Sequence, residues 1–156
     1  MHKGLYCLCT RLVLLLLMAA AAPGHAAPAV QKVIEQARIT RAADGRPVLA
    51  VRLGFVFAYQ DHFPDGSGTE LRIRIRPVLV PPVDRAALTR REGTRPPGAS
   101  LACIDEVLYE GDAREGPWLT IRFTRTMHYR VIATPDRRSL KIFIEPPEKC
   151  TTEASP

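Results

Sequence analysis

The strongest fold signal in this chain is a short stretch of sequence, Leu71-Arg72-Ile73-Arg74-Ile75-Arg76-Pro77. Apolar residues and arginines alternate strictly over its first six positions. Because successive side chains of a β-strand point to opposite faces of the sheet, one face of this strand is apolar and the other is cationic. The pattern predicts a half-buried strand that ends at Pro77.

The same alternation recurs on both sides of this stretch. Toward the N-terminus, residues 33–40 and 48–57 are predicted strands, and the Asp44-Gly45 pair between them is typical of a hairpin turn. Toward the C-terminus, residues 101–109 are a further candidate strand. The clearest alternation there lies in residues 119–124, 128–131 and 139–144, with a turn over 135–138.

Turn-forming residues separate these segments. Residues 59–69 are dense in Asp, Gly, Pro and Ser and predict a loop. Residues 77–100 predict a long Pro-rich loop, with room for a short helix over 84–92 that Asp84 caps. The 14 prolines of the chain disfavour long helices. The expected fold is therefore all-β, a small antiparallel sandwich of about six or seven strands with at most a short helix.

The first 26 residues have the layout of a secretory signal peptide. Lys3 and Arg11 precede an apolar run, Leu12 to Ala22, and Gly24-His25-Ala26 places small residues before a cut at Ala27. The alternative is an uncleaved anchor, which would be the only contact with a membrane. In both cases the domain is exported, and we expect a periplasmic or secreted protein.

Removal of residues 1–26 from the chain of 156 leaves 130 residues, which suffice for one domain. The formal net charge falls from +6 to +4, because Lys3 and Arg11 are lost and no acid is. A multi-domain enzyme is excluded by length, and the apolar run is shorter than the roughly 20 residues that a spanning helix needs. We expect a leader over 27–32, the β domain over 33–147 and a polar tail over 148–156.

Cysteine usage agrees with export. Cys7 and Cys9 belong to the signal segment, so Cys103 and Cys150 remain as one pair. In an oxidising compartment an even pair predicts a disulfide, worth roughly 3–4 kcal/mol by the chain-entropy model. The alternative is two unrelated thiols. Close Cys-x-x-Cys spacing is lacking, and we expect neither a metal site nor a cofactor.

Six cations on the polar side of predicted strands are the candidate binding residues. If their strands are neighbours, one face of the sheet becomes a basic field that attracts an anionic polymer or an acidic protein. The alternative is an ordinary solvated face paired with nearby carboxylates. Nucleic acid is not expected, because the aromatic residues do not alternate with the arginines. The six residues are Arg72, Arg74, Arg76, Arg122, Arg130 and Lys141.

A catalytic reading rests on His62 and is weaker. His62 and His128 are the only histidines after the signal segment, and no nucleophile motif accompanies either one. Core packing best explains Phe55, Phe57, Tyr59 and Phe63, although Phe63, like Trp118, flanks a turn. We expect Trp118 to anchor the core. The alternative is that Phe63 and Trp118 lie in a groove and stack on sugar rings.

The order of these motifs resembles an exported β domain of proteobacterial envelope proteins, the type often followed by tetratricopeptide repeats. The resemblance rests on Phe57-Ala58-Tyr59-Gln60-Asp61-His62-Phe63-Pro64 and on Gly68-Thr69-Glu70 before the arginine strand. The closing segments 116–123 and 140–144 are similar to the final strands of an AMIN-type domain. This resemblance implies a small periplasmic β module that helps to localise envelope proteins at the cell wall.

The expected function is therefore non-catalytic: binding of an envelope polymer or an envelope protein, including a repeat-containing partner, for targeting or scaffolding. The second hypothesis is a small secreted hydrolase or inhibitor, with a cleft formed by His62, Asp61, Asp65 and Glu70. A third is a structural subunit that exchanges an edge strand with its partner.

Overall fold

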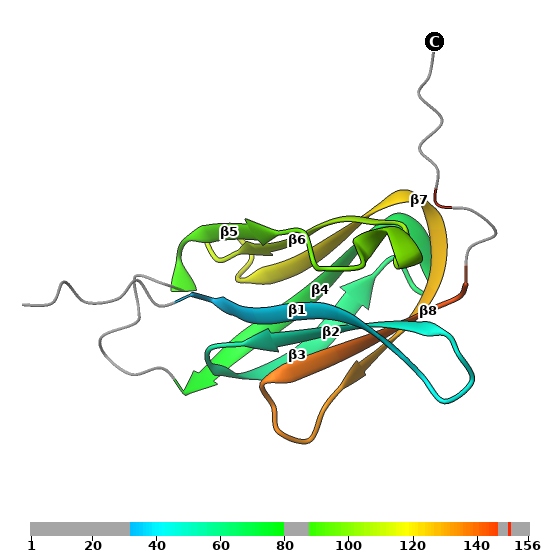
Figure 1. The fold of residues 1–156 in the computed structure, drawn as a ribbon. Coiled ribbons are helices and arrows are strands. Elements are labelled where there is room, and N and C mark those ends of the chain that lie inside the picture. The colour runs from blue at the N-terminus through cyan, green and yellow to red at the C-terminus, as the bar shows by residue number, and fades with distance from the viewer. Residues whose placement is uncertain (1–31, 80–87, 147–149, 151–156) are drawn as a thin grey trace, which may run out of the picture. The chain divides into compact units, whose positions relative to one another are not determined.

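The computed structural model describes residues 32–79, 88–146 and 150, and these residues form mainly antiparallel β-strands (Figure 1). The described part contains eight strands, one more than the upper end of the expected number, and a single 3-10 turn. The expected all-β class is confirmed. The strands are β1 (Ile34–Arg41), β2 (Pro47–Leu53), β3 (Val56–Phe63), β4 (Ser67–Leu79), β5 (Arg91–Thr94), β6 (Ile104–Glu110), β7 (Trp118–Ala133) and β8 (Ser139–Ile144), and the turn is η2 (Ala99–Ala102).

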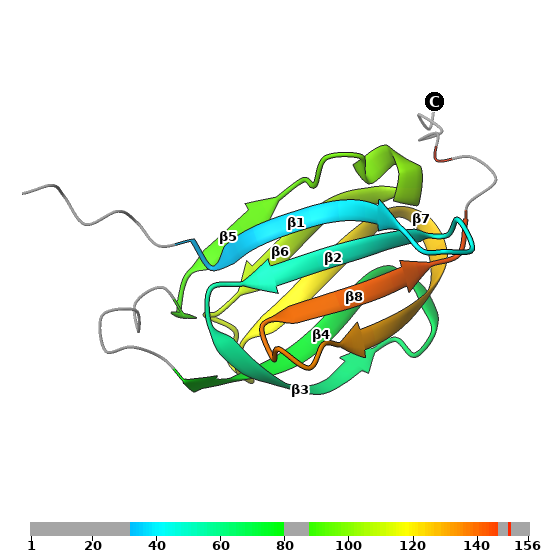
Figure 2. The same cartoon turned by 60° about the horizontal axis from the view of Figure 1, so that its bottom comes forward.

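The strands form two layers that share β7. Sheet A has the order β1-β2-β8-β7, and sheet B has the order β3-β4-β7-β6-β5. Every pairing between these strands is antiparallel. Figure 2 shows β1, β2 and β8 side by side in front of the strands of sheet B. The result is a small β-sandwich.

The 16-residue strand β7 changes its partners along its length. Its first half pairs with β4 and β6, as in the register of Leu119 with Ile73 and Tyr109. Its second half, from Tyr129 to Ala133, pairs with β8. Residues 124–126 are exposed, Met127 and His128 still pair with β4 of sheet B, and the strand belongs to sheet A from Tyr129 onward.

The core lies between the two sheets and follows the predicted alternation. Leu71, Ile73 and Ile75 of β4 are buried, as are Leu140 and Ile142 of β8. Burial of each such side chain contributes roughly 1.5–3 kcal/mol relative to exposure. The apolar face predicted for the arginine strand is therefore the face that holds the sandwich together.

Both predicted turns with strong signals are confirmed. The β1–β2 hairpin closes over Ala42–Arg46, with Gly45 in the left-handed region at φ 83°. That conformation has little cost for glycine. The turn before β8 is held by Asp136, which accepts hydrogen bonds from the backbone N–H groups of Arg138 and Ser139.

Three predicted boundaries are wrong. The segment 48–57 is two strands, since β2 ends at Leu53 and β3 begins at Val56. The predicted loop 59–69 is mostly strand, and only residues 64–66 lie outside β3 and β4. β4 also continues through Pro77 to Leu79; Pro77 lies beyond the end of the β7 pairing and needs no N–H for that ladder.

The Pro-rich connection and the ends of the chain are only partly described. Residues 80–87 lie outside the described part, so most of the predicted short helix over 84–92 is not covered. At its end, Arg91 and Glu92 begin β5 instead. The candidate strand 101–109 starts with η2, and its strand β6 begins at Ile104. The predicted signal segment 1–26, most of the leader and most of the tail also lie outside the described residues.

The predicted disulfide is confirmed. Cys103 and Cys150 are bonded, with a Cα–Cα distance of 4.9 Å and a sequence separation of 47 residues. Cys103 is buried beside β6, and Cys150 packs against the core. The bond thereby attaches the chain beyond β8 to the body of the sandwich.

Candidate functional site

The six predicted cations lie on two different faces of the molecule. Arg72, Arg74, Arg76 and Arg122 lie on the outer face of sheet B, on β4 and the first half of β7. Arg130 and Lys141 lie on the outer face of sheet A. The expected single basic field is therefore divided, because β7 passes from one sheet to the other between Arg122 and Arg130.

Carboxylates neutralise much of the outer face of sheet B. Arg74 forms an ion pair with Asp61 on the neighbouring strand β3. Arg122 lies between two acids, 3.4 Å from Glu70 and 3.1 Å from Glu106. Two of the four predicted residues on this face are therefore occupied by partners from the sheet itself.

Trp118 also lies on the outer face of sheet B, which corrects the expected core anchor. It alternates with Leu119, whose side chain is in the core, and therefore points away from the core. The guanidinium carbon of Arg72 lies 4.6 Å from the Trp118 ring centroid, and that of Arg74 lies 5.6 Å away. The two arginines cover the ring, which is only 9% exposed.

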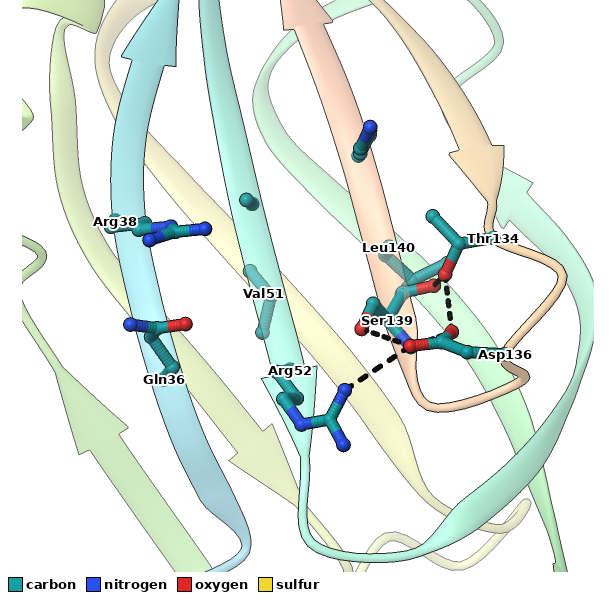
Figure 3. A pocket seen from close by; sticks show the side chains of 10 residues that line it. Gln36, Arg38, Val51, Arg52, Thr134, Asp136, Ser139 and Leu140 are labelled. Atoms are coloured by element: carbon teal, nitrogen blue, oxygen red, sulfur yellow. Dashed lines mark hydrogen bonds and ion pairs between the residues drawn. The ribbon is translucent and has the colours of Figure 1, made fainter.

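The outer face of sheet A has a different arrangement, centred on Ala50. The strand register places Arg38 of β1 opposite Ala50 of β2, and Ala50 opposite Lys141 of β8. A small side chain thus separates two long cationic ones. The surface here has a depression of about 240 Å³ whose lining includes all three residues (Figure 3).

One end of this depression is a hydrogen-bonded rim. Arg52 forms ion pairs with Asp136 at 3.2 Å and with Glu35 at 3.1 Å. Asp136 also accepts hydrogen bonds from the hydroxyl groups of Thr134 and Ser139, which Figure 3 shows as dashed lines. These bonds, with the Thr134 hydroxyl first, hold the pKa of Asp136 well below its ordinary value. The Asp136 carboxylate at this rim is therefore ionised and held in place by the turn.

Three cations of this face have no carboxylate partner. Within the described part of the chain, Arg38, Lys141 and Arg130 form no ion pair. Arg38 and Lys141 line the depression, and Figure 3 shows Arg38 extending from β1 toward β2. Arg130 lies over the ring of Phe143, 5.1 Å from its centroid. Uncompensated cations beside a depression are the elements of an anion-binding surface.

The residues of the hydrolase hypothesis do not converge. The Nδ1 atom of His62 lies 2.5 Å from the Tyr59 hydroxyl, and its Nε2 atom lies 3.7 Å from Asp65. Asp61 and Glu70 instead form ion pairs on the outer face of sheet B. The four residues therefore do not form one cleft.

The predicted aromatic series is buried at its start and exposed at its end. Phe55 and Phe57 are buried and pack edge to face, as expected, and Tyr59 is partly buried against the core. Phe63 at the end of β3 is 71% exposed and lies opposite Arg72, so the prediction that it packs in the core is wrong. A bulge between Tyr59 and Asp61 changes which face the later residues of β3 occupy.

No group of three or more His, Cys, Asp or Glu side chains in the described part of the chain is placed to hold a metal ion. Among the same residues, no helix is long and apolar enough to cross a bilayer.

Comparison with known proteins finds no match to a family model, to a curated protein or to a solved structure.

Sequence reasoning missed Arg38 and Arg52 as candidate site residues. Both lie on the polar side of the first two predicted strands. The hairpin at Asp44-Gly45 fixes the register that places Arg38 opposite Ala50. The position of Arg38 could therefore have been predicted from the sequence. The pairing of β2 with β8, which adds Lys141, joins segments about 90 residues apart and has no local signal.

Proposed function

We propose that this protein is an exported, non-catalytic β module that binds an anionic component of the cell envelope through the outer face of sheet A. The ligand is an acidic polymer or an acidic protein surface. In this role the module serves targeting or scaffolding.

Two observations support the exported location. The sequence begins with the charge and hydropathy pattern of a secretory signal. The bond between Cys103 and Cys150 is of the kind that persists in oxidising compartments and is rare in the cytosol. The resemblance of the strand motifs to AMIN-type domains favours the cell wall as the location.

One observation carries the binding proposal. Arg38 and Lys141 lie on either side of Ala50, they line the same depression, and neither has an ion-pair partner among the described residues. Two strand spacings place their Cα atoms about 9.5 Å apart. Both side chains are long enough to contact one acidic group that lies between them. A guanidinium group adds a two-point hydrogen bond to a carboxylate or phosphate.

The test is co-sedimentation of the purified protein with isolated sacculi at increasing salt concentration. The variant R38S/K141S removes both cations of the depression. The control R76S/R114S removes the same charge from two exposed arginines, one on the outer face of sheet B and one in the β6–β7 loop. We expect the first variant to lose about tenfold or more in affinity, and the control to retain most of it.

Salt dependence is the second readout, because ion-pair binding weakens as counterions screen the charges. Equal losses in the two double variants would show that net charge, not the outer face of sheet A, governs binding. Affinity that does not change with salt would contradict the proposal directly. Circular dichroism of each variant verifies that the fold is retained.

A further inference from the structure

A second depression lies on the outer face of sheet A, next to the one at Ala50. It has a volume of about 320 Å³. Phe143 and Glu145 contribute to its lining, while Ser139 and Lys141 of the same chain segment line the first depression. Lys141 and Phe143 are successive residues on one face of β8, so the two depressions follow one another along this strand.

The second depression also combines cations with one acid. Arg130 lies over Phe143 and has no ion pair within the described residues, and His128 and Arg46 add further donors. Arg46 is paired with Asp44 at 2.6 Å. Glu145 is the acid of this depression, as Asp136 is of the first.

The two depressions together are longer than a single sugar unit. Their lining runs along the β8 segment from Ser139 to Glu145, six residues or about 20 Å of extended strand. A small anion therefore occupies one depression at a time. A ligand that fills both must be a chain that runs along β8.

We propose that the two depressions are subsites for one linear acidic glycan that lies along β8. This inference rests on the proposed function and specifies its ligand. Arg38 and Lys141 take one acidic group, and Arg130 takes another. Gln36 and Ser139 line the surface as hydrogen-bonding groups for sugar hydroxyls.

The acids in the lining favour a glycan over a denser polyanion. Asp136 and Glu145 lie in the first and second depressions. Polyphosphate carries a charge on every phosphate and no neutral hydroxyl groups between them, so some of its charges would lie against a carboxylate, which is unfavourable. A glycan offers neutral hydroxyl groups at such positions, and a carboxylate accepts their hydrogen bonds.

The experiment is calorimetric titration with oligogalacturonates of two, four and six units, with polyphosphate of matched charge as a separate arm. We expect affinity to rise about tenfold or more between the shortest and the longest oligomer, because only the longer one reaches both subsites. R130S should remove most of that gain, and because the two-unit oligomer keeps the subsite at Arg38 and Lys141, its affinity should fall by no more than about twofold. K141S should weaken all lengths, and R76S should weaken none.

The outcomes separate this inference from the proposed function. Affinity that is independent of length, or an R130S variant that behaves as the native protein, overturns the two-subsite arrangement. Tighter binding of polyphosphate than of the matched glycan overturns the ligand class. If no oligogalacturonate binds while R38S/K141S still abolishes binding to sacculi, this inference fails and the proposed function stands.

Discussion

The guanidinium group of Arg72 lies over the ring of Trp118, 4.6 Å from its centroid, on the face of sheet B that points away from the core. Trp118 is the only tryptophan of the chain. Its fluorescence therefore reports on this one place in the structure. A ring at the surface remains largely hidden from water because two arginines lie over it.

We predict that Arg72→Ala shifts the Trp118 emission maximum to longer wavelength and increases its quenching by acrylamide. The substitution uncovers the ring, and loss of an exposed cation–π contact costs about 0.5–1 kcal/mol. Urea titration measures the stability change. R76A is the control, since no contact of Arg76 with the ring is present; an equal shift in R76A would contradict the assignment.

The inward face of β4 should dominate stability. Ile73 is fully buried, and Ile73→Ala removes packing at the centre of the sandwich, with an expected cost of about 2–5 kcal/mol. Arg76→Ala on the same strand should change stability by no more than about 0.5 kcal/mol. Denaturant unfolding of both variants measures this difference. Similar costs for the two would show that the strand is not half-buried.

Removal of the disulfide should destabilise the fold without changing its secondary structure. The bond closes a long loop between Cys103 and Cys150, and the chain-entropy model gives about 4 kcal/mol for it. The variant C103S/C150S is compared with the native protein by thermal unfolding and circular dichroism. Reduction of the native protein should have the same effect, and reduction of the variant should have none.

Acid should weaken the turn before β8 through Asp136. Its pKa in the folded state lies below the ordinary value of 3.8, because hydroxyl and backbone N–H groups donate to the carboxylate. The stabilising contribution is therefore complete above about pH 4 and is lost as the pH falls toward the folded pKa. Asp136→Asn should be less stable at neutral pH and lose less stability on acidification. Unfolding curves between pH 7 and 2 that run in parallel would contradict this.

Filling the depression should block binding without removing any charge. Ala50→Leu places a larger side chain between Arg38 and Lys141, and we expect a loss of affinity for sacculi of about tenfold or more. Ala58→Leu makes the same change on the outer face of sheet B and should leave binding intact. Co-sedimentation compares the two variants. If A58L is equally impaired, the depression at Ala50 is not the binding surface.

The sequence predicts the parts of this fold that depend on local pattern. The alternation at residues 71–76 and 139–144 identifies the buried face, and Asp44-Gly45 and 135–138 identify two turns. The sequence predicts a loop over Asp61-His62-Phe63, and this prediction is wrong. The composition of this segment is typical of turns, but pairing with β4 and a bulge after Tyr59 keep it in a strand.

The candidate site was less accessible to sequence reasoning. Alternation shows that a cation points outward from its strand, but it does not show which sheet the strand joins. Arg122 and Arg130 lie in one continuous strand and still belong to different faces. The partners of Arg74 and Arg122 come from other strands, and the register that brings them together is a tertiary property.

The strand β7 supplies backbone hydrogen-bonding partners to both sheets. Neither layer can peel away from the other while this strand remains extended, so the sandwich has no internal seam at which it divides into two independently folding halves. A load applied to one layer is transmitted along a single covalent backbone to the other. The sandwich should therefore respond to force as one mechanical unit.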